Sequence, residues 1–286
     1  QGLIEAGVRR VVAAMQDPNP LVAGQGMQQL TAAGINVESG LLQPQAEALN
    51  PGFIKRMRTG LPYVRCKMAM SLDGRTAMAS GESHWISSDA SRRDVHRLRA
   101  QSAAILTGVG TLLADNPSMD VRLSREDLGL DEDLSVPRPL RVVLDPDLAT
   151  PIAARMLTLP GSTLIICREG ASQAAGALEA AGAMVACVAA DGDKLDLHQV
   201  MELLAAQQIN EVLLECGATL AGAMLQNALI DELIIYQAPH IMGNSARGLF
   251  LLPGLARMAE RIALQVTDLR QIGPDIRITA HPIQSS

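Results

Sequence analysis

From Pro62 onward, apolar runs of strand length alternate with helix-length segments, and this alternation limits the folds that the chain can adopt. Residues 140–145 and 211–215, for example, have the length and composition of buried strands, whereas residues 87–100 have the spacing of an amphipathic helix. Successive strands joined by helices run mostly parallel to one another. We therefore predict an α/β domain over residues 62–286, built on a mixed, mostly parallel sheet flanked by helices.

The remaining elements of this domain follow from the same pattern. Two closing segments, 263–269 and 275–280, are joined across Gly273 and Pro274, which predicts an antiparallel hairpin at one edge of the sheet. The acidic stretch 124–133 has no periodicity and indicates a solvated loop. The other predicted strands are residues 63–71, 104–107, 163–167, 183–188 and 232–237, and the other predicted helices are residues 172–181, 197–208 and 219–228.

Residues 1–49 show a shorter version of the same alternation, with a helix end, a strand, a helix and a strand. A segment of about 45 residues buries too little apolar surface for a stable core, so it is typical of half a domain. The chain also begins at Gln1 on a helix-like stretch, and we expect it to be a fragment of a longer protein. A basic segment bounded by glycine and proline, residues 50–61, is the predicted linker.

Charge and composition narrow the range of partners. The formal net charge is −6, and aromatic residues make up only 2% of the chain. An acidic chain gains little from counterion release, and few rings are available for base stacking, so we expect no nucleic-acid partner. No apolar run approaches the ~20 residues of a membrane span, and the sequence shows no signal-peptide pattern. We predict a cytoplasmic protein with no membrane partner.

The cysteines and histidines do not indicate a metal site. None of the four cysteines forms a C-x-x-C pair, and Cys66, Cys167 and Cys187 lie inside apolar runs, so we predict buried, reduced thiols. The five histidines are not spaced three or four residues apart, and we interpret His96 and His198 as helix-face residues. The sequence contains no zinc-binding motif, and we therefore expect no metal in this chain.

A strand–glycine–helix junction at residues 211–226 is the most informative local feature. Gly217 follows the strand and Thr219 opens the helix, so free backbone N–H groups and the positive end of the helix would converge on one point, as in phosphate sites. Gly222 predicts close packing of this helix, and Glu215 ends the strand where α/β sheets bind their ligands. The alternative is an ordinary strand-to-helix turn with a capping acid.

Two further segments combine turns with chemically useful side chains. Residues 67–85 form a hairpin-like excursion that ends at Trp85, the only tryptophan, which either packs in the core or covers a cofactor ring. Residues 108–122 end at Arg122, and Arg99 lies near the end of the preceding helix. Two converging arginines suit bidentate binding of a phosphate, although each arginine alone is more often a surface residue.

Together, these segments resemble the bacterial bifunctional riboflavin-biosynthesis enzymes that join a diaminohydroxyphosphoribosylaminopyrimidine deaminase to a 5-amino-6-(5-phosphoribosylamino)uracil reductase. The resemblance covers essentially the whole chain. The strings that carry it, in chain order, are AGVRRVVAAMQDPNPLVAGQG, LNPGFIKRMRTG, KMAMSLDGRTAMASGES, RPLRVVLD, TLAGAMLQ and APHIMGNSARGL.

The resemblance implies a dihydrofolate-reductase-like reductase domain over residues 62–286 and, over residues 1–49, the C-terminal remnant of a cytidine-deaminase-like domain. The zinc ligands of such a deaminase come from H-A-E and P-C-x-x-C motifs, which this sequence lacks, so deaminase activity and zinc are not expected here. The implied reaction uses NADPH to reduce the ribosyl group of the phosphoribosylaminouracil to a ribityl chain. A homodimer or higher homo-oligomer is also implied.

The resemblance further implies roles for individual residues. Lys67 and Asp115 are the candidates for supplying the proton, and the sequence does not decide between them. Substrate contacts are implied for Ser83, Arg99, Met119, Arg122 and Glu215. Cofactor contacts are implied for Ala69, Trp85, Thr111, Asp115, Gly217, Ala218, Thr219, Leu220, Ala221, Gly222 and Ala223.

Two other functions fit parts of this pattern. A different NADPH reductase of the same fold, acting on a pterin, would not need the paired arginines, so turnover of an unphosphorylated substrate would favour it. A non-catalytic NADP-binding module left by truncation would bind NADPH but consume no substrate.

Overall fold

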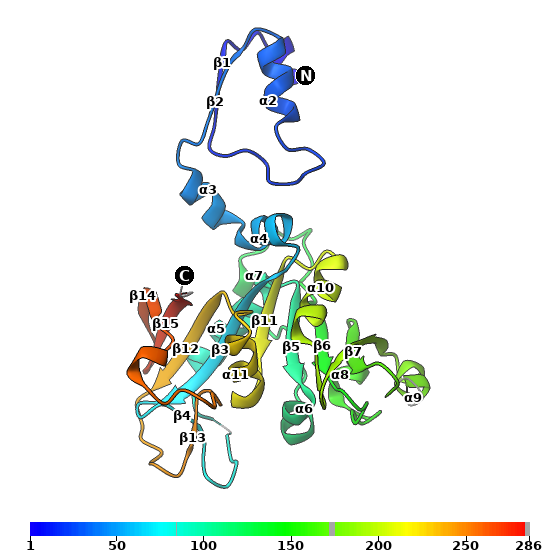
Figure 1. Ribbon diagram of the computed structural model, residues 1–286, viewed down its shortest axis with the longest axis vertical. Helices are drawn as coiled ribbons and strands as arrows, with labels where there is room; N and C mark the ends of the chain where they lie inside the picture. The colour runs from blue at the N-terminus through cyan, green and yellow to red at the C-terminus, as the bar shows by residue number, and fades with distance from the viewer. Residues whose placement is uncertain (84, 172–174, 284–286) are drawn as a thin grey trace. The chain divides into compact units, whose positions relative to one another are not determined.

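The chain folds into two units in the computed structural model, which describes residues 1–83, 85–171 and 175–283 (Figure 1). The first unit is Gln1–Tyr63 together with Leu204–Asn210, and the second is Val64–Leu203 with Glu211–Ser286. All the residues with a predicted catalytic or binding role belong to the second unit.

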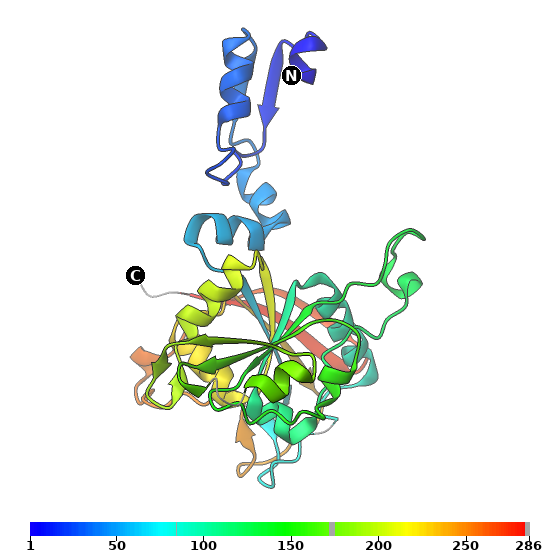
Figure 2. The same cartoon turned by 90° about the vertical axis from the view of Figure 1, so that its right-hand side faces the viewer.

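A nine-stranded sheet organises the second unit (Figures 1 and 2). Its strands are β3 (Tyr63–Ser71), β5 (Ala104–Gly108), β6 (Leu140–Leu144), β7 (Thr163–Arg168), β8 (Met184–Val188), β11 (Glu211–Glu215), β12 (Glu232–Ala238), β14 (Leu264–Ile272) and β15 (Asp275–Pro282). They are ordered β14–β15–β12–β3–β11–β5–β6–β7–β8. β12 pairs in parallel with β3, and β11, β5, β6, β7 and β8 pair in parallel in succession. β14 and β15 form the predicted antiparallel edge hairpin, so the predicted mixed, mostly parallel α/β sheet is confirmed.

Helices connect these strands and cover both faces of the sheet (Figure 2). They are α5 (Asp89–Gln101), α6 (Val109–Asp115), α7 (Arg125–Leu128), α8 (Arg155–Thr158), α9 (Ala175–Ala180), α10 (Leu197–Ala206) and α11 (Ala218–Gln226). Residues 108–122, where the sequence indicated a turn, begin with α6. The loop expected at residues 124–133 contains α7, because Ser124 and Asp127 form a capping box. The helix predicted at 172–181 is α9, with residues 172–174 outside the described residues.

The first unit pairs two short parallel strands with helices. Its elements are α1 (Gly2–Glu5), β1 (Arg10–Ala13), α2 (Gln25–Ala32), β2 (Asn36–Ser39), α3 (Gln43–Leu49) and α4 (Pro51–Thr59). β1 and β2 pair in parallel and α2 packs against β2, in the predicted order of helix, strand, helix and strand. Residues predicted as a linker form α4, because Pro51 fits the first turn of a helix and Gly60, at φ 74°, ends it.

The core of the second unit lies around its central strands. Ile105 in β5, Val143 in β6 and Ile165 in β7 are all 0% exposed and belong to one apolar cluster with Cys167. Cys187 was predicted to be buried, and this prediction is wrong, because β8 is the last strand of the sheet and leaves the thiol exposed. An apolar run alone does not distinguish an edge strand from a central one.

Polar contacts fix α5 to the hairpin and to β12. Ser88 caps the helix, and its own N–H donates to the buried carboxylate of Asp275 at 2.7 Å. Asp94, in the middle of α5, accepts hydrogen bonds from the Tyr236 hydroxyl at 2.6 Å and from Nη1 of Arg277 at 3.0 Å. The groups that make these contacts are largely shielded from water. The contacts therefore hold α5 in place, and with it the side chains near its C-terminus.

Gly222 is packed as closely as predicted, and Gly222→Ala is expected to reduce the free energy of unfolding by about 1–3 kcal/mol. A β-carbon at this position would lie 2.1 Å from the carbonyl oxygen of Leu251. Leu251 cannot retreat freely, because its N–H donates to the carbonyl of Ala218 at 3.0 Å. Urea unfolding measures the effect. Gly176→Ala in α9 is the control, since a β-carbon there meets nothing within 4 Å, and equal stability of the two variants would contradict the packing argument.

Candidate active site

Lys67, Arg99 and Glu215, here called the Lys67 cluster, lie close enough to shift one another's pKa values. Lys67 is in β3, Glu215 ends the neighbouring strand β11, and Arg99 is on α5. Nε and Nη2 of Arg99 donate to Oε1 and Oε2 of Glu215 at 2.6 and 2.9 Å, so this ion pair is bidentate. The two side chains are only 11% and 16% exposed, which shields the pair from water.

The alternation of the strands explains why these groups share one face of the sheet. Lys67 is the register partner of Ile234 in β12, and Ile234 packs beneath α5 with Val95 and Leu98. Register partners point to the same face, so Lys67 also faces α5. Arg99 is one turn beyond Val95 on α5 and therefore extends over the same face.

Burial and charge set the protonation states of the cluster. Burial lowers the pKa of Lys67, the positive charge of Arg99 lowers it further, and Glu215 only partly opposes this shift. Burial alone would raise the pKa of Glu215, but the charge and hydrogen bonds of Arg99 outweigh it, and the pKa lies below its ordinary value. At neutral pH the carboxylate is thus ionised, and Lys67 releases a proton more readily than an exposed lysine.

The segment from Asp120 to Arg122 is attached to α5 at two backbone points. Nη1 of Arg99 donates to the carbonyl of Asp120 at 2.9 Å, and the N–H of Arg122 donates to Nδ1 of His96 at 3.2 Å. The Arg122 side chain is 61% exposed and lies 3.1 Å from the Asp120 carboxylate. The two arginines are therefore connected through the backbone of this segment. The guanidinium of Arg99 is already bound by Glu215, so Arg122 is the more accessible cation.

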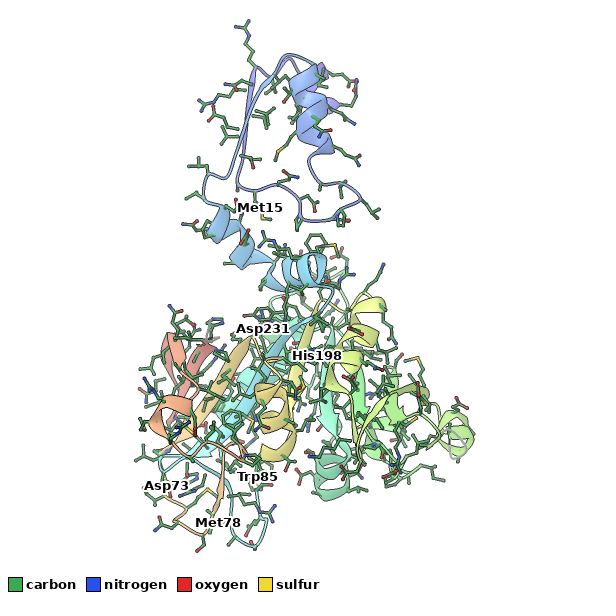
Figure 3. The ribbon with its side chains drawn as sticks, in the orientation of Figure 1. Met15, Asp73, Met78, Trp85, His198 and Asp231 are labelled. Carbon is green, nitrogen blue, oxygen red and sulfur yellow. The ribbon has the colours of Figure 1, made fainter. Side chains whose placement is uncertain are left out.

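A hollow of about 280 Å³ brings Ser83 and Trp85 together. Trp85 is 73% exposed, so the interpretation of this side chain as core packing is wrong. The Arg92 guanidinium lies 4.3 Å from the centre of its ring. Figure 3 shows Asp73, Met78 and Trp85 at one end of the second unit. The residues lining the hollow are Met78, Glu82, Ser83, Trp85, Ile86, His240, Ile241 and Met242.

Asp73 stabilises one wall of this hollow, a role that sequence reasoning missed. Its carboxylate accepts hydrogen bonds from the Ser71 hydroxyl at 2.5 Å and from the N–H groups of Met242 and Gly243 at 3.0 and 2.8 Å. The bond from Ser71, with those from the backbone, lowers the pKa of Asp73 to about 2. Asp73 and Gly74 together read as a simple turn in the sequence, which gave no sign of partners 169 and 170 residues away.

The resemblance implies that Trp85 contacts NADPH, and on that basis Asp73→Asn is expected to weaken binding of NADPH several-fold, because an amide replaces a carboxylate that accepts three hydrogen bonds. Quenching of Trp85 fluorescence measures binding, since Trp85 is the only tryptophan and lines the hollow. Because the pKa of Asp73 is lowered, its carboxylate contributes fully to the stability of the fold above about pH 3.9. This contribution to stability is lost as the pH falls through 2. Asp133→Asn in the exposed acidic stretch is the control, and equal affinity in both variants would contradict this role.

The start of α11 lies beside the start of α6. Gly217 is the N-cap of α11, and a β-carbon on it would lie 4.0 Å from Oγ1 of Thr111. Gly217 and Thr219 are exposed, whereas Ala221 and Gly222 are buried on the inner face of the helix. Of the predicted cofactor residues 217–223, Gly217, Ala218 and Thr219 can therefore face a ligand. Ala221 and Gly222 are buried and can only pack the helix against the rest of the unit.

Three other predicted site residues lie outside α11. Asp115 is exposed at the C-terminal end of α6, about 10 Å along the helix from its start. Met119 is 3% exposed in the apolar core, so any contact with a substrate has to come from its backbone. Ala69 is half-buried in β3, two residues from Lys67 and on the same face.

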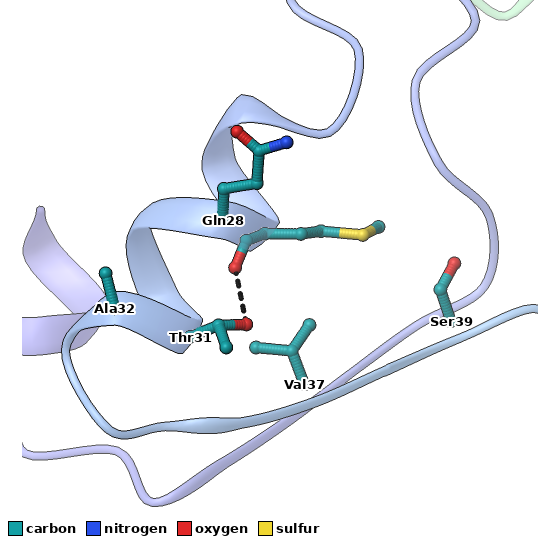
Figure 4. A pocket seen from close by; sticks show the side chains of 6 residues that line it. Gln28, Thr31, Ala32, Val37 and Ser39 are labelled. Atoms are coloured by element: carbon teal, nitrogen blue, oxygen red, sulfur yellow. Dashed lines mark hydrogen bonds between the residues drawn. The ribbon is translucent and has the colours of Figure 1, made fainter.

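A second hollow, of about 470 Å³, lies in the first unit between α2 and β2 (Figure 4). It is lined by Met27, Gln28, Thr31, Ala32, Val37 and Ser39, and the Thr31 hydroxyl donates to the carbonyl of Met27 at 2.9 Å. None of these six side chains ionises between pH 5 and 9, so this hollow offers no acid or base.

Among residues 1–83, 85–171 and 175–283, no group of three or more His, Cys, Asp or Glu side chains is arranged to hold a metal ion. Within the same ranges, every helix is too short or too polar to cross a bilayer.

Comparison with known proteins gives consistent matches. Residues 62–278 match the family described as the RibD C-terminal domain. The riboflavin biosynthesis protein RibD of Escherichia coli (strain K12) is 47% identical over 277 residues, which cover 96% of this chain and 74% of that protein. The structure of Acinetobacter baumannii RibD superposes with a TM-score of 0.86 at 41% identity, covering 99% of this chain and 75% of the other. A deaminase/5-amino-6-(5-phosphoribosylamino)uracil reductase from Thermotoga maritima gives a TM-score of 0.79 at 26% identity, covering 98% and 73%.

Proposed function

The chain belongs to the RibD C-terminal domain family, and on that premise we propose that it uses NADPH to reduce the ribosyl group of 5-amino-6-(5-phosphoribosylamino)uracil to a ribityl chain. The observation that carries this proposal is the shielded Lys67 cluster next to the exposed Arg122. A proton donor, a hydrogen-bond acceptor and an accessible cation are the three groups that a phosphorylated sugar undergoing reduction requires.

The residues at the start of α11 fit the pyrophosphate of NADPH. The N–H groups of Ala218, Thr219 and Leu220 have no acceptor one turn earlier in the helix, and Gly217 has no side chain to block an approaching anion. Trp85 offers an exposed apolar ring at the hollow. NADPH would supply the hydride to C1′ of the sugar.

Lys67 is the better candidate for the proton donor. Its ammonium group donates a proton to the ring oxygen of the ribose as the bond from C1′ to that oxygen breaks, and the exocyclic nitrogen supplies the electron pair that forms a protonated imine. Addition of one hydride at C1′ then gives the neutral amine, so one proton and one hydride are consumed. Asp115 is less suitable, because it is exposed and lies at the far end of α6 from Gly217.

Glu215 and Arg99 act as a unit in this proposal. The Glu215 carboxylate keeps lone pairs that the two Arg99 bonds do not use, and these can accept hydrogen bonds from the ribose hydroxyls. Its negative charge also raises the pKa of Lys67 and so favours the protonated donor. Arg99 fixes the orientation of the carboxylate, which leaves the phosphate to Arg122.

Arg122→Ala is expected to raise the KM for the phosphorylated substrate by about 10- to 100-fold, because one charge-assisted contact to phosphate is lost. The kcat and the affinity for NADPH should change little. Steady-state kinetics with the phosphorylated substrate and its dephosphorylated analogue measure the effect, and the variant should match the wild type on the analogue. Arg125→Ala is the control, since Arg125 donates to the carbonyl of Glu132. An equal loss on both substrates would refute the role in phosphate binding.

A further inference from the structure

His96 lies within the site, but the proposed reaction gives it no role. It lies on α5, three residues before Arg99, so both side chains share one face of the helix. The Arg99 guanidinium donates a hydrogen bond to the carbonyl of Asp120, and Nδ1 of His96 accepts a hydrogen bond from the N–H of Arg122 at 3.2 Å. These two contacts attach the backbone on either side of Val121 to α5.

The contact requires an unprotonated Nδ1. A ring nitrogen accepts a hydrogen bond only through its lone pair, and the imidazolium form has none available. Burial lowers the pKa of His96, and the charges of Arg99 and Arg122 add to this effect, while Glu215 and Asp120 oppose it. These four groups face His96 from α5, from β11 and from the segment that it holds, and their net effect keeps the ring neutral near pH 7.

We propose that His96 is a positioning residue for substrate recognition: it holds the backbone of Arg122 so that the exposed guanidinium is presented to the phosphate of the substrate. The inference rests on the proposed function, because it assigns His96 to the binding of the same phosphate. His96 does not touch the reacting atoms, so its loss should alter KM for the substrate and spare kcat.

The test compares His96→Leu and His96→Asn in the full chain. The amide oxygen of asparagine can accept the N–H of Arg122 in place of Nδ1, whereas leucine offers no acceptor. We expect His96→Leu to raise the KM for the phosphorylated substrate by roughly threefold to tenfold, the effect of one neutral hydrogen bond. His96→Asn should stay near the wild-type value, and both variants should keep the wild-type kcat and KM for NADPH.

The pH profile supplies a second readout. The substrate phosphate itself titrates near pH 6, and this effect is common to the wild type and His96→Asn. Protonation of His96 below its ordinary pKa of about 6.5 removes the acceptor only in the wild type, so the KM of the wild type should rise more steeply as the pH falls. A wild-type KM that instead falls at low pH would make His96 a direct cationic ligand of the phosphate and overturn the positioning role.

Other outcomes separate the inference from the proposed function. If the wild type turns over and His96→Asn is as impaired as His96→Leu, or if kcat falls in place of KM, the inference fails while the function stands. If the wild type does not turn over, the function fails. Amide hydrogen exchange at Arg122 then still tests the contact, since exchange should be faster in His96→Leu than in His96→Asn, and equal rates would reject it.

Discussion

Lys67→Met is expected to lower kcat by about 10²- to 10⁴-fold, the usual contribution of a positioned general acid. Methionine has a similar length and tolerates burial, so the fold and the affinity for NADPH should be retained. In the wild type, kcat should also fall as the pH rises through the lowered pKa of Lys67, below the ordinary lysine value of about 10.4, because only the protonated form donates. Steady-state turnover across the alkaline range measures both effects.

Lys194→Met is the matched control for this variant, because Lys194 is exposed in β10 (Lys194–Leu195). It should keep the wild-type kcat and the wild-type pH profile. Retention of kcat in Lys67→Met would remove Lys67 from the reaction. Asp115→Asn would then become the decisive variant, since Asp115 is the competing donor.

Arg99→Met is expected to reduce the free energy of unfolding by about 3–5 kcal/mol at neutral pH, because it leaves the carboxylate of Glu215 largely buried without its partner. Urea unfolding measures the loss. The lowered pKa of Glu215 stabilises the wild type above its unfolded value of about 4.3, and this contribution disappears as the pH falls through the folded pKa. The gap between Arg99→Met and the wild type should therefore narrow below pH 4.

Two comparisons control this experiment. Arg97→Met changes an exposed arginine on the same helix and should stay within about 0.5 kcal/mol of the wild type. The double variant Arg99→Met with Glu215→Met should recover much of the lost stability, since it removes the stranded charge together with its partner. A double variant as unstable as Arg99→Met alone would mean that lost packing, and not the unpaired carboxylate, causes the effect.

The alternation of apolar runs and helical segments was sufficient to predict the sheet and its edge hairpin, because strand and helix periods differ clearly. It could not place Cys187, since an edge strand and a central strand share the same apolar composition. Glycine and proline signals were ambiguous for a related reason. Gly60 and Pro51 delimit a helix where a linker was expected, and the glycines after β5 begin α6 where a turn was expected.

The candidate site was only partly predictable because its contacts span long sequence separations. The resemblance assigned both Arg99 and Glu215 to the substrate, yet the two side chains, 116 residues apart, bind each other. No local pattern encodes such a pair. His96 did carry a local signal, since it lies one turn before Arg99 on the same face of a helix. Without the position of Arg122, that spacing was equally consistent with an ordinary surface histidine.

The proposed reduction is tested most directly by turnover of the wild-type chain with NADPH and 5-amino-6-(5-phosphoribosylamino)uracil. The loss of NADPH absorbance is followed while mass spectrometry identifies the product. We expect substrate-dependent oxidation of NADPH and one equivalent of a product that carries two additional hydrogens on its sugar. Binding of NADPH without its oxidation would contradict the proposed reduction and favour a non-catalytic module.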